Sequence, residues 1–71
     1  MTPKQYAAII TRLGLSQVGA ARFLGVDERT SRRWISGERE IPEPVARFLT
    51  FIAAANLTPE EVEKVIRRYR A

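Results

Sequence analysis

The chain has 71 residues, which is enough for one small domain and leaves little room for a deep internal cavity. It contains no Cys and no His, so it has neither a disulfide framework nor a thiolate zinc site, and it lacks the commonest general base. Its 12 basic residues outnumber its 8 acidic residues, and the resulting net charge of +4 favours an anionic partner.

The first predicted helix has a clear start and a clear stop. Residues 2–5, Thr-Pro-Lys-Gln, form a capping box with Pro at the first helical position. Gly14 is expected to end the helix in the left-handed conformation that other residues avoid. A single apolar face follows from the helical spacing of Tyr6, Ile9, Ile10 and Leu13.

Two further short helices are predicted on either side of a tight turn. Ser16 caps a helix that ends at Leu24 and Gly25, and Asp27 caps a helix that runs to Ser36 and Gly37. Two helices that cross steeply at close range need small residues at the crossing. Those residues are expected to be Ala20 and Ala21.

Residues 38–44 are predicted to form a loop, because each Pro disfavours helix at the residue before it. A fourth helix is expected over residues 44–55, and a fifth after the capping box of residues 58–61. Their predicted apolar faces are Val45, Phe48, Leu49 and Ile52, then Val62, Val65, Ile66 and Tyr69. No strand is predicted, so we expect an all-α single domain over residues 1–71.

The third helix separates its residues sharply by type. On a helical wheel, Thr30, Ser31 and Trp34 fall on one arc, and Arg29, Arg32, Arg33 and Ser36 fall on the opposite arc. The arginine arc is unfavourable in isolation, because Arg29 and Arg33 form a like-charge pair one turn apart that costs roughly 0.2–0.5 kcal/mol. It is either an ordinary solvated face or a surface that enters the major groove of DNA, where arginine binds guanine O6 and N7.

The segment from Ser16 to Gly37 resembles the helix-turn-helix of the phage-repressor family, the Cro- or XRE-type regulators. The resemblance covers residues 13–52. It is carried by Gln17, Ala21, Leu24, Gly25, Val26, Trp34 and Gly37. It implies a compact five-helix lambda-repressor-like domain, with a helix-turn-helix at about residues 16–36.

The resemblance also implies a DNA-binding site. It implies that Gln17 contacts phosphate, that Arg39 lies near a phosphate, and that the outer residues of the third helix meet base edges and backbone. The complete predicted set is Gln17, Asp27, Glu28, Arg29, Arg32, Arg33, Ser36 and Arg39. Trp34 falls on the inward arc and is expected in the core, as are Tyr6 and Tyr69 on their apolar faces.

Two residues depart from the family pattern. Ser31 occupies an inward position that is usually aliphatic, and its hydroxyl is expected to bond the carbonyl of Asp27 one turn back. On that interpretation Ser31→Val should raise the melting temperature. Gly19 lies inside the second helix and marks either a close approach or a tolerated weakness.

The predicted function is sequence-specific binding of double-stranded DNA through the major groove, by a cytoplasmic regulator of transcription. Homodimerisation through the fourth and fifth helices is expected, since Phe51 lies off the apolar stripe. The alternative is an interaction module, such as an antitoxin or accessory phage protein, that binds an acidic protein. Single-stranded nucleic acid is a weaker alternative, because no exposed aromatic platform is predicted. We expect no enzyme activity, metal, cofactor, small-molecule ligand or membrane association.

Overall fold

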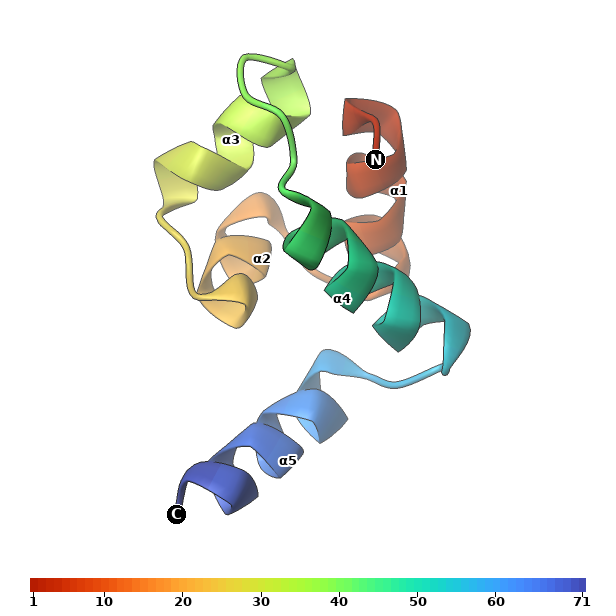
Figure 1. Ribbon diagram of the computed structural model, residues 1–71, viewed down its shortest axis with the longest axis vertical. Helices are drawn as coiled ribbons and strands as arrows, with labels where there is room; N and C mark the ends of the chain where they lie inside the picture. Colours follow the sequence, from red (N-terminus) through yellow and green to blue (C-terminus); the bar gives the residue numbers. More distant parts are fainter.

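A computed structural model describes all 71 residues and shows five helices and no strand, which confirms the predicted all-α class (Figure 1). The helices are α1 (Pro3–Arg12), α2 (Gln17–Leu24), α3 (Glu28–Ser36), α4 (Glu43–Ala54) and α5 (Pro59–Arg70). None of them has the length and apolar character needed to cross a membrane. The contacts of α1 with α3 and α4, and of α2 with α3, build the body of the protein.

Both predicted capping boxes are present. At the start of α1, the backbone N–H of Gln5 donates to Thr2 Oγ1 at 3.1 Å, and the N–H of Thr2 donates to Gln5 Oε1 at 2.8 Å. Thr58 and Glu61 make the same two bonds at the start of α5, at 2.9 and 3.1 Å. These bonds to Thr58 lower the pKa of the Glu61 carboxyl below its ordinary value.

The start of α4 differs from the prediction by one residue. The helix was expected from Pro44, because a proline disfavours helix at the residue before it, but Glu43 is its first residue and Pro42 precedes it. Pro44 lies in the first turn, where its missing N–H would have no partner within the helix. The first turn therefore accepts a proline that would break the helix further along.

The core lies where α1, α2, α3 and α4 meet. Its buried residues are Tyr6, Ile10, Ala20, Trp34 and Leu49. The rings of Tyr6 and Trp34 pack edge to face with their centroids 5.6 Å apart. Trp34 is 3% exposed, so its predicted place in the core is confirmed.

The predicted partner of Ser31 is wrong, although its burial is confirmed. Its hydroxyl bonds the hydroxyl of Tyr6 at 2.7 Å, and both residues are fully buried. The carbonyl of Asp27 instead accepts the backbone N–H of Ser31 in the ordinary helical pattern, at 3.2 Å. Burial raises the pKa of the Tyr6 hydroxyl above its ordinary value, and the bond to Ser31 offsets part of that increase.

Helix α5 extends from the body and is labelled below it in Figure 1. The molecule is accordingly elongated, with extents of 36 × 23 × 20 Å. Val62 is the one buried residue of α5, while Tyr69 is 92% exposed. The prediction that Tyr69 packs in the core is therefore wrong, because the apolar face of α5 continues beyond the surface that the body offers it.

Candidate nucleic-acid interface

A short turn fixes α3 relative to α2. Gly25 has a φ of +73°, a conformation that glycine adopts without steric cost. The N–H of Val26 then donates to Ala21 O at 2.9 Å, and the N–H of Gly25 donates to Arg22 O at 3.2 Å. These two bonds satisfy carbonyls at the end of α2 and turn the chain directly into α3.

The inner side of α3 is anchored in the core. Ser31 and Trp34 are its two buried residues, and the first of them is hydrogen-bonded to Tyr6 of α1. Ala20 and Ala21 of α2 are also buried, as expected for small residues at a close helix contact. Because packing holds its inner side, α3 presents its outer side on a supported helix.

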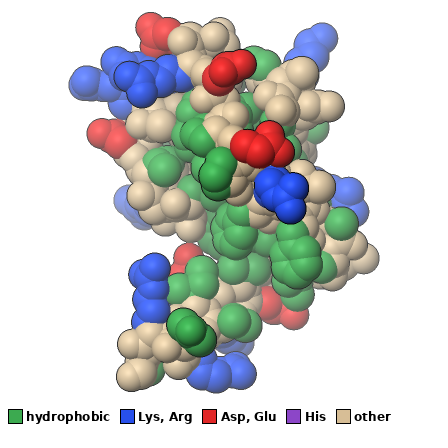
Figure 2. All heavy atoms as spheres, in the orientation of Figure 1, with side chains coloured by type: hydrophobic (Ala, Val, Ile, Leu, Met, Phe, Trp, Pro, Cys, Tyr) green, Lys and Arg blue, Asp and Glu red, His purple; other side chains and the backbone are tan.

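The outer side of α3 is basic and accessible. Arg29 and Arg32 are exposed, and Arg33 is half-buried. Figure 2 shows blue side chains gathered at the upper left of the molecule, where α3 lies, with acidic side chains around them. The structure thus brings together the three arginines that the helical wheel placed on one arc.

Two of these arginines have acidic partners. Arg32 Nη1 lies 3.4 Å from Glu28 Oε1, one turn apart on α3, and Arg33 Nε lies 3.1 Å from Glu38 Oε2. All four side chains are at least 39% exposed, so solvent and salt screen both pairs. Arg29 has no carboxylate within ion-pair distance.

Glu38 is a site residue that the sequence analysis missed. The chain reverses at Gly37, which has a φ of +82°, and this reversal returns Glu38 to Arg33. The N–H of Arg39 closes the same turn by donating to Arg33 O at 3.2 Å. A helical wheel ends where the helix ends, so the glycine after Ser36 was the only signal available.

The polar side chains at the ends of α3 are already hydrogen-bonded within the protein. Asp27 Oδ1 accepts the N–H of Arg29 at 3.0 Å, which confirms the predicted cap. Ser36 Oγ donates to Arg33 O at 3.1 Å and accepts the N–H of Glu38 at 3.3 Å. Both residues are exposed, and both hold an end of α3 in place.

The remaining predicted residues come from outside α3. Gln17 is the first residue of α2, and Arg39 follows the turn after α3; both are exposed. Gly19 lies near Gln17, and a Cβ added to it would meet Ser16 Oγ at 3.2 Å. The close approach at Gly19 is therefore to the cap of its own helix, whose hydroxyl accepts the N–H of Gly19 at 3.0 Å.

The acidic residues around the interface do not form a metal site. Nowhere in the chain do three acidic side chains converge closely enough to hold a metal ion. Comparison of the chain with models of known protein families, with curated proteins and with solved structures finds no match. The residues of α3 and its flanking turns are therefore interpreted on their own geometry.

Proposed function

We propose that this protein binds double-stranded DNA in a sequence-specific manner and regulates transcription by occupying an operator. The observation that carries the proposal is the two-sided character of α3. Ser31 and Trp34 fix its inner side at 0% and 3% exposure, and arginines line its outer side. A single helix of this kind fits the major groove of B-DNA, which is about 12 Å wide. In this proposal α2 and α3 act as the helix-turn-helix of a lambda-repressor-like domain.

The arginines of α3 are proposed to read bases. Arg29 has no acidic partner to displace, so it is free to bind O6 and N7 of a guanine. Arg32 would exchange an exposed pair with Glu28 that is worth about 0–1 kcal/mol for a contact with DNA. Glu38 holds the guanidinium of Arg33 at a defined position, which reduces the freedom that Arg33 loses on binding.

The residues that flank α3 are proposed to position it. Gln17 and Arg39 are assigned to phosphates, where contacts set orientation and carry no sequence information directly. Asp27 and Ser36 hold the two ends of α3 beside the DNA through the caps described above. Glu28 lies in the first turn, where it orients Arg32 and accepts from cytosine N4 when the sequence offers one.

The test is selection of random duplexes by the purified protein at physiological salt, followed by sequencing. An enriched motif is expected, and it should weaken in the Arg29→Ala variant. Arg12→Ala is the matched control, because it removes an exposed arginine from α1 and leaves α3 intact. The absence of an enriched motif, or better binding to the same sequence as a single strand, would refute the proposal.

A second candidate function is binding of an acidic protein, as an antitoxin or accessory phage protein would do. An open groove of about 800 Å³ between α1 and α4 favours it, because Arg12 and Arg47 flank an apolar floor that includes Ile9 and Ala46. Salt separates the two candidates. Binding to phosphates falls log-linearly with salt concentration as counterions are released, whereas apolar contacts in this groove would resist salt.

A further inference from the structure

An apolar surface remains open where α4 meets α5. A hollow of about 350 Å³ between the two helices is lined almost entirely by hydrophobic side chains, among them Phe48, Leu57 and Ile66. Phe51 and Val65, which also line it, are 64% and 60% exposed. Figure 2 shows the corresponding green side chains in the middle and lower part of the molecule, over α4 and α5. We call this region, together with Tyr69, the α4–α5 surface.

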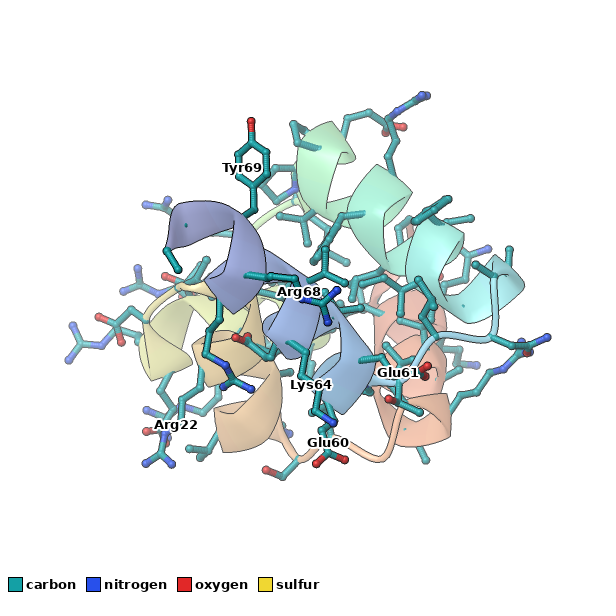
Figure 3. The ribbon with its side chains drawn as sticks, turned by 90° about the horizontal axis from the view of Figure 1, so that it is seen from below. Arg22, Glu60, Glu61, Lys64, Arg68 and Tyr69 are labelled. Carbon is teal, nitrogen blue, oxygen red and sulfur yellow. The ribbon has the colours of Figure 1, made fainter.

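Helix α5 has little support within one copy of the chain. It is 12 residues long, and isolated helices of about this length are marginal in water even with good sequences. Its capping box stabilises the first turn, but Val62 is the one residue that it buries. The last turn exposes Tyr69, whose ring points away from the body in the view from below (Figure 3). A helix this exposed on its apolar side gains most from a surface that covers it.

The charges on α5 specify which surface that is. Its first half carries the acidic residues Glu60, Glu61 and Glu63, and its last turn carries Arg67, Arg68 and Arg70. Two copies of α5 packed antiparallel about a two-fold axis place each acidic half against a basic half. A parallel pair would instead set like charges against each other. The helix therefore carries a charge order that complements its own sequence in the opposite direction.

We propose that a second copy of this chain covers the α4–α5 surface, with the two α5 helices antiparallel and the two-fold axis near Val65. In that register, residues equally far from Val65 face one another, so Glu61 of one copy meets Tyr69 and Arg68 of the other. The ring of Tyr69 then covers the partner's hollow at Phe51 and Val65. This interface is isologous, as expected for a closed dimer. The proposal rests on this surface alone and holds whether or not the protein binds DNA.

The test is the molar mass in solution as a function of concentration, measured without DNA by sedimentation equilibrium. The unsubstituted chain is expected to form dimers, and Val65→Asp should raise the dimer dissociation constant at least about tenfold, because it places a charge at the centre of the interface. Tyr69→Ala should weaken the dimer as well, and the 92% exposure of Tyr69 means that folding of the single chain does not depend on it.

The matched control is Val18→Asp, which makes the same change at an exposed valine on α2. It should leave the dimer unchanged. A chain that stays monomeric up to about millimolar concentration, the upper end of weak association, would overturn the proposal. A dimer that Val65→Asp and Tyr69→Ala weaken no more than Val18→Asp does would also overturn it, since a different surface would then hold the copies together.

Cysteine variants test the direction of the two helices, because the natural chain has no Cys. Val65→Cys lies at the proposed axis and should form a cross-linked dimer under mild oxidation. Two copies of Tyr69→Cys would lie roughly 12 Å apart along the helices, given a rise of about 1.5 Å per residue, which is too far for a disulfide. Equal cross-linking of the two variants would contradict the antiparallel arrangement.

Discussion

Replacement of Ser31 is the sharpest test of the core, because the sequence and the structure predict opposite results. The sequence pattern favours an aliphatic residue at this inward position, so Ser31→Val was expected to stabilise the protein. The structure shows that the Ser31 hydroxyl is bonded to the hydroxyl of Tyr6 at 2.7 Å, with both residues fully buried. Loss of Ser31 Oγ would leave the hydroxyl of Tyr6 without a partner and away from water.

The expected magnitude follows from the cost of an unpaired buried hydroxyl. That cost is about 1–3 kcal/mol, and the added methyl groups of valine return about 0.8 kcal/mol each only where the core has room for them. We therefore expect Ser31→Val to lower the free energy of unfolding by about 1 kcal/mol or more. In a domain of this size, each kcal/mol corresponds to about 4–8 °C in melting temperature.

A double-mutant cycle isolates the hydrogen bond from the change in side-chain volume. Ser31→Ala leaves the hydroxyl of Tyr6 unpaired, whereas Tyr6→Phe leaves Ser31 free to turn its hydroxyl toward the carbonyl of Asp27. Tyr6→Phe should therefore cost less than Ser31→Ala. The combined variant should cost less than the sum of the two, with a coupling of about 1 kcal/mol.

The assay is reversible thermal and denaturant unfolding of the four proteins, followed by circular dichroism. A higher melting temperature for Ser31→Val would refute the reasoning, because it would show that the hydroxyl of Tyr6 finds another partner or water. Additive single changes in the cycle would refute it as well, because they would show that the two hydroxyls do not depend on each other.

Three further predictions concern the turn, the pH response and the DNA interface. Gly25→Ala should lower the free energy of unfolding by about 1–2 kcal/mol in a denaturant titration; its Cβ would meet no atom within 4 Å, so the whole cost is the left-handed backbone at φ +73°. Because the pKa of Tyr6 is raised on folding, the unfolded chain loses that proton first, so stability should fall as pH rises above the ordinary tyrosine value of about 10, and Tyr6→Phe should remove this part of the loss. In binding assays on sequence variants of a selected site, Arg29→Ala should relax the preference at one base pair by about 1–3 kcal/mol, whereas Gln17→Ala should weaken all sequences equally; identical profiles for the two would contradict the assigned roles.

The starts and stops of the helices were predictable because the interactions that make them are local. A capping box spans four residues, so Thr2 with Gln5 and Thr58 with Glu61 could be identified directly from the sequence. The left-handed glycines at positions 14, 25 and 37 were predictable for the same reason. The single error, at the start of α4, arose where the first turn tolerates a Pro that the rest of a helix does not.

The arginine face of α3 was also predictable, since the helical period alone separates Arg29 and Arg32 from Ser31 and Trp34. The ion pair of Arg33 with Glu38 was not, because it depends on how the chain turns after the helix ends. The helical wheel therefore identified which residues share a face. It did not identify which of those residues are already paired within the protein.

Only the tertiary structure decided which apolar and polar residues are covered. Ser31 and Tyr6 are 25 positions apart, so no local pattern could pair their hydroxyls. Tyr69 continues the same apolar spacing as Val62, yet one is 92% exposed and the other 8%, because the body of the protein ends beneath the first turns of α5. Periodicity sets the direction in which a side chain points, and burial depends on whether another element lies there to receive it.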